Sequence, residues 1–408
     1  MNISYKGGAV IALAVAGLLA GAYTLGTKQS GKSAVPLASA SDNTSPAVPP
    51  SHPPVGGEAK AGADPNAKFT HFRVGNRNVK SILADGELMW VGTSGGVIRY
   101  DTTNDGYELY DNTKGLLSNG VFYVGKVGQR IAVGTYGGGL SLFDPASKQW
   151  QNYNVPQGLG DAFVYDMIET PNGDLWIATW SGANRVRGGK LDDRKAWETF
   201  TVENTKGGLP NDWVYGLENG KDGEVWLGTE GGLARFKDGK WQNWKHSDGL
   251  GADYELVKAD IKFANDPGKQ SSHHSRQKSE QGLDNVNVAY NPNYIISMAV
   301  DADGIVWCGT WGGGLARFDG KQWRNFTTKE GLPSNHIFML HTDAQGELWF
   351  GTSDGLVHWD RQGNQVARTY TTADGLFSNN VFSMAEDGKQ NRWIGSYGGV
   401  SRIVALAQ

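Results

Sequence analysis

The hydrophobic pattern of the chain consists of short strand-like runs separated by turns rich in glycine, serine and aspartate. The clearest unit predicts four antiparallel strands, at 337–341, 348–352, 356–360 and 367–370. A turn at Asp343-Ala344-Gln345-Gly346 separates the first two strands, and a tight hairpin at Ser353-Asp354-Gly355 joins the second to the third. Glycine supplies the positive φ that such hairpins need.

This unit recurs along the chain. Its second strand reads Trp-aliphatic-Gly-Thr before a glycine-rich hairpin, with small variations. The seven copies are Trp90-Val91-Gly92-Thr93, Ala132-Val133-Gly134-Thr135, Trp176-Ile177-Ala178-Thr179, Trp226-Leu227-Gly228-Thr229, Trp307-Cys308-Gly309-Thr310, Trp349-Phe350-Gly351-Thr352 and Trp393-Ile394-Gly395-Ser396. Successive copies are 42, 44, 50, 81, 42 and 44 residues apart. All but one of these intervals fit the period of a four-stranded propeller blade.

The long interval holds an insertion between blades four and five, at 251–291. This segment is polar and charged and lacks the repeat signature. We predict a mobile, solvated loop in which Tyr254–Val257 and Val286–Val288 pair as a short extra hairpin. Its adjacent histidines, His273 and His274, are weak metal ligands without a third partner at fixed spacing. We therefore expect no metal and no cofactor.

The two ends of the repeat region predict how the ring closes. The last copy stops after its third strand near Val404, and Lys68–Phe72 matches outer strands such as Trp150–Tyr153. The N-terminal strand should complete the last blade, which removes exposed sheet edges. The predicted fold class is all-β, a seven-bladed β-propeller of four-stranded antiparallel blades that spans residues 68–408.

The first 67 residues predict export and a spacer. Lys6 precedes an uncharged apolar stretch, residues 7–27, which is long enough to cross a bilayer as one helix. Ala20-Gly21-Ala22 also fits a signal-peptidase site, so a signal anchor and a cleaved signal peptide both remain open. Residues 28–67 are rich in proline, alanine and serine and predict a disordered linker.

A second recurring segment, Gly-Leu-Pro-Ser-Asn, follows the outer strand of several copies. It reads Lys114-Gly115-Leu116-Leu117-Ser118-Asn119, Gly207-Gly208-Leu209-Pro210-Asn211, Glu330-Gly331-Leu332-Pro333-Ser334-Asn335 and Asp374-Gly375-Leu376-Phe377-Ser378-Asn379. Together, the strand pair and this segment resemble the two-component regulator propeller repeat over about residues 69–404. The resemblance implies the periplasmic input half of a membrane histidine kinase, responding to ligands such as oligosaccharides.

We therefore expect an extracytoplasmic ligand-binding or sensing module. Because no kinase sequence follows Gln408, the signal should leave through a membrane or periplasmic protein partner or through the N-terminal helix. The expected location is the inner membrane, single-pass, with the propeller in the periplasm, or secretion if residues 1–27 are cleaved. The expected ligand is an oligosaccharide or a peptide. A net charge of −4 without a basic run in the globular part argues against nucleic acid.

The predicted binding face combines the residue at the hairpin tip of each blade with the asparagine segments, since both should emerge on one side of a propeller. Aromatic faces beside amides and carboxylates suit sugar rings or apolar side chains, although the same aromatics could pack on neighbouring hairpins. The candidate residues are Tyr136, Trp180, Glu230, Trp311, Tyr397, Asn119, Asn211, Asn335, His336 and Asn379.

Two other functions remain open. One is a docking scaffold for an exported or membrane complex. The other is a metal-dependent lyase like the streptogramin-inactivating propellers, with His336 as general base and Glu230 near an ion. We assign no catalytic residue from the sequence, and we do not expect the protein to be an enzyme. Cys308 is the only cysteine, so no intramolecular disulfide can form.

Overall fold

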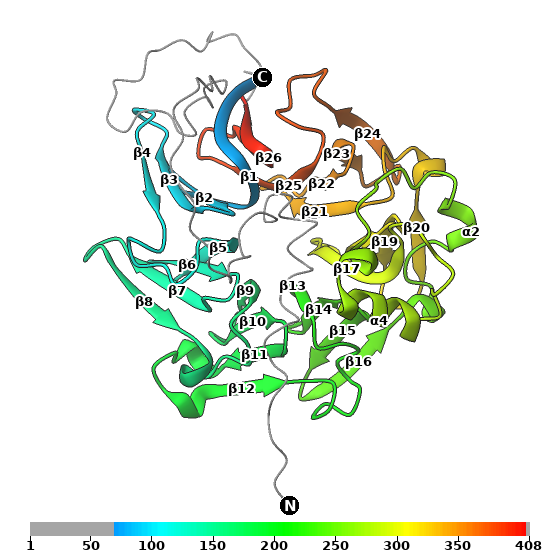
Figure 1. Cartoon of the computed structure of the whole chain (residues 1–408), viewed down its shortest axis with the longest axis horizontal. Coiled ribbons are helices and arrows are strands. Elements are labelled where there is room, and N and C mark those ends of the chain that lie inside the picture. Colours follow the sequence, from blue (N-terminus) through cyan, green and yellow to red (C-terminus); the bar gives the residue numbers. More distant parts are fainter. Residues whose placement is uncertain (1–68, 405–408) are drawn as a thin grey trace, which may run out of the picture.

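The repeated strands form antiparallel sheets arranged around a common axis (Figure 1). The computed structural model describes residues 69–404. Within that range, five sheets have four strands each and one has six. The second blade from the C-terminal end matches the predicted unit over residues 337–370, strand by strand. The described part of the chain is therefore an all-β propeller.

The six-stranded sheet contains two blades and closes the ring. Strand β1 (Phe69–Asp85) pairs with β26 (Arg392–Ile403) over its first residues, from Phe69 opposite Ile403 to Arg73 opposite Gly399. Its later residues, from Val79 to Asp85, pair with β2 of the first blade. The N-terminal strand therefore completes the last blade, as predicted, and the ring has seven blades.

The remaining strands follow in chain order. Blades one to three add β2 (Leu88–Thr93), β3 (Gly96–Asp101), β4 (Tyr107–Tyr110), β5 (Val121–Val127), β6 (Arg130–Thr135), β7 (Leu140–Asp144), β8 (Gln149–Tyr153), β9 (Val164–Glu169), β10 (Leu175–Thr179), β11 (Gly182–Val186) and β12 (Trp197–Phe200). Blades four and five contain β13 (Val214–Asn219), β14 (Val225–Thr229), β15 (Gly232–Lys237), β16 (Lys240–Trp244), β17 (Asn291–Val300), β18 (Val306–Trp311), β19 (Leu315–Phe318) and β20 (Trp323–Phe326). Blades six and seven contain β21 (Ile337–Thr342), β22 (Leu348–Thr352), β23 (Gly355–Asp360), β24 (Gln365–Tyr370) and β25 (Val381–Glu386).

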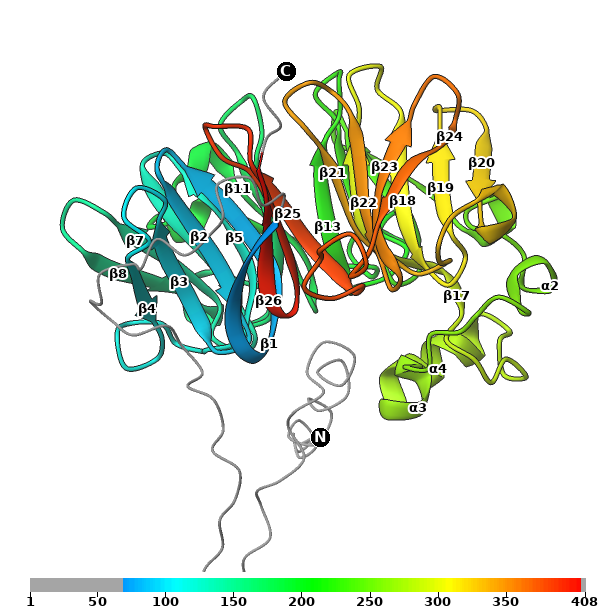
Figure 2. The same ribbon diagram turned by 90° about the horizontal axis from the view of Figure 1, so that it is seen from above.

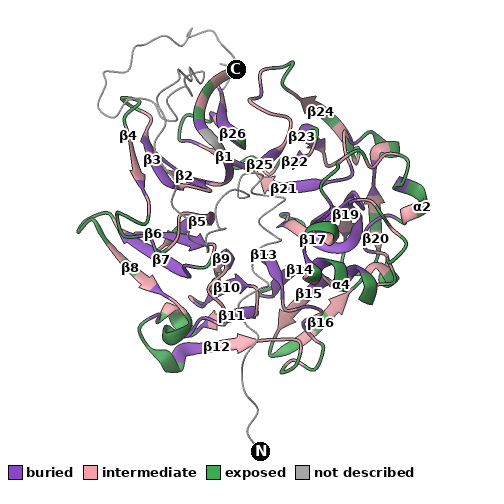
Figure 3. Ribbon diagram, in the orientation of Figure 1, coloured by how far each residue is buried: buried purple, intermediate pink, exposed green. Residues whose placement is uncertain are grey.

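The repeat motif packs one blade against the next. The hydroxyl of Thr352 donates to the carbonyl of Gly355 at 2.9 Å and so fastens its own hairpin. Gly351 faces the next blade so closely that a Cβ there would lie 2.4 Å from the carbonyl oxygen of Val381. The core consequently lies between blades, where the second strands are buried, while outer strands are partly exposed (Figure 3).

Aspartates in the turns after three inner strands anchor the repeat tryptophans. Each carboxylate accepts a hydrogen bond from an indole Nε1 at 2.9 Å, in the pairs Asp301–Trp307, Asp343–Trp349 and Asp387–Trp393. The same carboxylates also accept backbone N–H bonds within their turns. These contacts give the three aspartates a structural role.

The insertion between β16 and β17 differs from the predicted mobile loop. It contains three helices, α2 (Tyr254–Val257), α3 (Pro267–Gln270) and α4 (Ser272–Glu280), which project from one face of the ring (Figure 2). The predicted extra hairpin is wrong, because Tyr254–Val257 is helical and 286–288 has no strand. The physical reason is the buried ammonium group of Lys278. It donates to Asp266 and to the carbonyls of Val286 and Val288, which orders the segment.

Within residues 69–404, none of the helices has the length and apolar character required to cross a bilayer. The predicted anchor or signal peptide at residues 1–27 and the linker at 28–67 lie outside the described residues.

Candidate ligand-binding face and central cavity

The hairpin tips and the asparagine segments lie on the same face and contact each other. The hydroxyl groups of Ser334 and Ser353 are 2.7 Å apart, and the backbone N–H of Gly355 donates to the carbonyl of Asn379 at 2.7 Å. The side chain of Asn379 also donates to Asp354 at 3.1 Å. This arrangement places both halves of the repeat motif on one surface, as the sequence suggested.

Three of the candidate asparagines hold their own loops. The side-chain oxygens of Asn119, Asn335 and Asn379 each accept a hydrogen bond from a backbone N–H seven residues earlier, at 2.6–3.0 Å. Asn211 differs, since its amide donates to Gln277 of the insertion at 2.9 Å. These contacts give the asparagines a role in shaping the face.

The insertion interrupts one copy of the asparagine segment. Asn293 accepts a hydrogen bond from the backbone of His246 at 2.6 Å, as Asn335 does from Thr328. The sequence Gly249-Leu250 and the residue Asn293 thus belong to one segment that the insertion has separated. The signal in the sequence was Asn293, near the start of the inner strand β17, but the insertion separates it from Gly249.

The hairpin aromatics form a row in blades two to four. Tyr136 meets Phe163 edge to face, with ring centroids 4.6 Å apart. Trp180 then stacks between Phe163 at 4.1 Å and Trp213 at 4.4 Å, and Trp213 stacks on His273 of the insertion. Tyr136 and Trp180 are half-buried, so part of each ring remains accessible. Packing and surface exposure therefore coexist in this row.

Two candidate residues lie beneath the insertion, and one lies apart. Phe263 of the insertion packs on Trp311 and His336, with ring centroids 5.6 and 5.0 Å away. Trp311 and His336 are both buried, and His336 Nε2 lies 2.7 Å from the carbonyl oxygen of Ala289. Burial lowers the pKa of His336 to about 4. These contacts leave His336 poorly placed to act as the general base of a lyase. Tyr397 is exposed on another blade.

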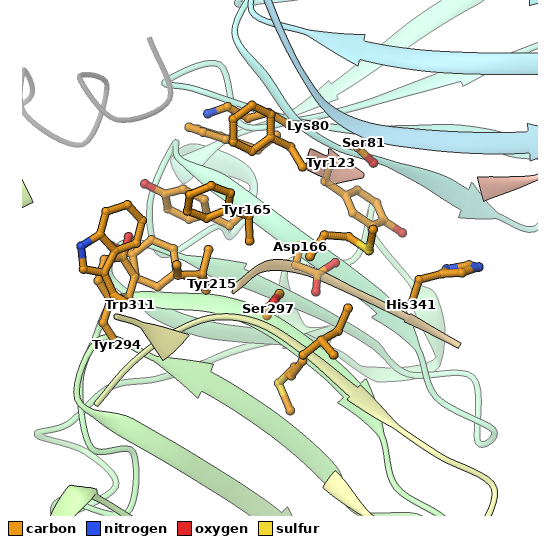
Figure 4. Close-up of a pocket in the computed structure, with 18 of the residues that line it drawn as sticks. Lys80, Ser81, Tyr123, Tyr165, Asp166, Tyr215, Tyr294, Ser297, Trp311 and His341 are labelled. Carbon is orange, nitrogen blue, oxygen red and sulfur yellow. The ribbon is translucent and has the colours of Figure 1, made fainter. Parts of the chain in front are cut away.

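A central cavity of about 410 Å³ lies where the inner strands meet (Figure 4). Its collar is formed by one residue from each blade, the residue that follows the strand position paired with the motif threonine or serine. The collar residues are Lys80, Phe122, Tyr165, Tyr215, Ile296, Phe338 and Phe382. In every blade the strand register shifts at this residue, which is a β-bulge. Bulges re-aim side chains, and here they turn seven of them toward the axis.

Beyond the collar the cavity wall carries two carboxyl groups. Burial raises the pKa of Asp166 to about 6, although the backbone N–H groups of Leu217 and Met167 donate to it at 2.8 Å and oppose the rise. Burial, together with the charge of Asp166, raises the pKa of Glu218 to about 8. Glu218 is therefore neutral at pH 7. Sequence reasoning missed these residues and the collar, because it concentrated on the hairpin tips.

Glu230 is buried at the contact between blade four and the insertion. Its carboxylate lies 2.5 Å from His274 Nδ1 and 3.3 Å from His273 Nε2. Burial favours the neutral form, but the two imidazoles outweigh it and lower the pKa of Glu230 to about 2. Glu230 therefore carries its charge inside the protein.

Comparisons with known proteins also identify propeller repeats in this chain. Residues 158–181, 208–231, 289–312 and 331–354 match the family described as Two component regulator propeller. The four matched segments are thus two-component regulator propeller repeats, and they lie within the β-propeller that the described residues form. No curated protein matches the sequence.

Solved structures share the propeller fold at low sequence identity. The extracellular domains described as those of the hybrid two component system BT3049 and the one component system BT4673, both from B. thetaiotaomicron, are 19% and 18% identical to the chain, with TM-scores of 0.60 and 0.61. They align with 80% and 83% of this chain, which spans only 40% of each of them. Virginiamycin B lyase from Staphylococcus aureus is 12% identical, with a TM-score of 0.56, and covers 83% of this chain and 99% of its own.

Proposed function

We propose that the chain is an extracytoplasmic ligand-binding propeller that provides signal input through a protein partner. The central cavity carries the proposal, because a bulge in each of the seven blades aims a side chain at one space. Its volume falls within the range of small-molecule sites, about 300–1,000 Å³. The likeness to extracellular domains of two component systems supports a sensing role at the level of the fold.

The proposed ligand is a neutral oligosaccharide. The collar offers flat aromatic faces, and Tyr165 and Tyr215 add hydroxyl groups. Glu218 is neutral at pH 7, so the polar wall can donate a hydrogen bond as well as accept one. A site of this chemistry suits hydroxyl-rich, uncharged ligands. In this proposal residues 1–27 anchor the chain in the inner membrane, or the chain is secreted if they are cleaved.

Calorimetric titration of the full chain in mild detergent with neutral oligosaccharides tests the ligand. We expect saturable binding that Tyr165→Ala or Phe122→Ala weakens by about tenfold or more, which corresponds to about 1.4 kcal/mol. Trp150→Ala, in the outer strand β8, is the matched control and should leave binding unchanged. Binding that survives both collar substitutions would contradict the proposed site.

Affinity capture from membranes tests the partner. A protein recovered in stoichiometric amounts whose binding changes with oligosaccharide supports signal input. A partner that binds equally with or without sugar, combined with no saturable sugar binding, would instead support the docking scaffold.

A further inference from the structure

Three side chains of metal-binding type converge where the insertion meets blade four. Glu230 occupies the hairpin tip between β14 and β15, and His273 and His274 are consecutive residues of α4. One ligand atom from each lies within 4.8 Å of the other two. The sequence-based objection that the paired histidines lack a third partner is therefore removed, because the third ligand comes from the propeller.

The two histidines reach one carboxylate with different ring nitrogens. His274 presents Nδ1 to one oxygen of Glu230, and His273 presents Nε2 to the other. The side chains of Glu230 and His274 are 1% and 2% exposed, so water does not compete freely for these atoms. A buried carboxylate between two imidazoles is a compact set of donors for one cation.

Hydrogen bonding alone does not account for the cluster. Among the described residues, the buried His273 Nε2 atom has no hydrogen-bond partner of acceptable geometry, although it lies 3.3 Å from a carboxylate oxygen of Glu230. A bound cation would engage all three groups together.

Surrounding rings fix the orientation of the donors. Trp213 stacks on His273 with an interplanar angle of 10°, and Tyr294 stacks on His274 at 21°. The hydroxyl of Tyr215 donates to Glu230 at 3.3 Å. Neighbours that hold ligand side chains in place are typical of metal sites.

We propose that Glu230, His273 and His274 form a zinc-type divalent metal site that fastens the insertion to blade four. Two imidazoles and one carboxylate suit Zn²⁺ and related transition metals, whereas Mg²⁺ and Ca²⁺ prefer oxygen ligands. Three protein ligands leave room for a water molecule at the fourth position. None of the three donors is a collar residue, although the site borders the proposed sugar cavity, since His274 lines that cavity and the collar residue Tyr215 contacts Glu230.

Metal titration of the full chain, stripped with chelator, tests the site. We expect one equivalent of Zn²⁺ to bind by calorimetry, and Co²⁺ to give the visible absorption of a four- or five-coordinate ion. Glu230→Gln should weaken binding by more than the roughly 10–100-fold typical of changes outside the ligand set. His358→Ala, which removes a histidine on blade six, should bind like the unchanged protein.

Hydrogen exchange provides a second readout that does not depend on affinity. Zn²⁺ should slow exchange of the α4 amides in the unchanged protein and in His358→Ala, but not in Glu230→Gln. Equal zinc binding by Glu230→Gln and the unchanged protein, or no zinc binding by either, would overturn the proposal. Binding that leaves α4 exchange unaltered would overturn its role as a fastening.

Discussion

Replacing Lys278 with methionine tests what orders the insertion. The Nζ atom donates to Asp266 at 3.0 Å and to the carbonyls of Val286 and Val288 at 2.7 and 3.0 Å, so all three ammonium protons are used. Methionine keeps most of the apolar stem and removes every donor. Asp266 would stay buried with the backbone N–H of Gly268 as its remaining partner.

The expected cost follows from this burial. Removing one partner of a buried ion pair destabilises a protein by about 3–5 kcal/mol. The partners of Lys278 all lie within the insertion, so the loss should act on local opening of that segment rather than on unfolding of the ring. A free-energy loss of about 3 kcal/mol raises the population of the open state by about two orders of magnitude.

Hydrogen exchange measured by mass spectrometry on the full chain checks this expectation. In Lys278→Met, peptides from 266–290 should exchange about 100-fold faster or more, while peptides from β22 keep their rates. Lys258→Met is the matched control, because Lys258 is exposed and pairs with the exposed Glu255 in the same insertion. Unchanged exchange at 266–290, or equal acceleration in β22, would refute the reasoning.

Two further predictions concern the ring. Asp343→Ala leaves the buried Trp349 Nε1 without its acceptor and should cost about 3 kcal/mol, lowering the melting temperature in calorimetry by about 4–5 °C. Asp303→Ala, at an exposed turn carboxylate, should change it little, and equal shifts would contradict this explanation. Glu218 has its pKa raised from 4.5 to about 8, so its contribution to stability is complete below pH 4.5 and is lost as pH rises toward 8. Urea denaturation should therefore show Glu218→Gln gaining about 1–3 kcal/mol over the unchanged protein between pH 4 and pH 8, and a constant difference would be inconsistent with a raised pKa at Glu218.

The ring of blades was predictable because each blade repeats the same sequence motif. Nearly every copy repeats three features: strand alternation, the threonine that holds the hairpin and the glycine that faces the next blade. A strand that is ambiguous in one copy can therefore be assigned from the equivalent strand in the others. Closure by Phe69 was predictable for the same reason, since the N-terminal segment resembles the outer strands of complete blades.

The insertion was not predictable from hydropathy. Helix α4 reads Ser-His-His-Ser-Arg-Gln-Lys-Ser-Glu and has no apolar face. Its buried residues are His274 and Lys278, spaced four apart on one side of the helix. Their burial depends on partners outside the helix, Glu230 and Asp266. A hydropathy average over the segment does not include these partners and therefore predicts that the segment is exposed to solvent.

The positions of the collar residues could in principle have been predicted from the sequence. It falls at the same position of every inner strand, one residue after the partner of the motif threonine or serine, and five of its seven members are aromatic. Strict alternation assigns that position to a strand face, whereas the β-bulge turns it toward the axis. The alternation of apolar and polar residues does not reveal a bulge, so the predicted binding face contained the hairpin tips and omitted the collar.

Departures from the repeat indicate where this chain differs from a generic propeller. Glu230 is the only carboxylate among the seven residues that directly follow the motif threonine or serine. The insertion is the one break in the blade period, and the structure places these two departures in direct contact. A repeat supplies partners for residues that recur in every blade. A buried charge that occurs once must find its partner in a segment that also occurs once, and that pairing favours Glu230 and α4 as a site particular to this chain.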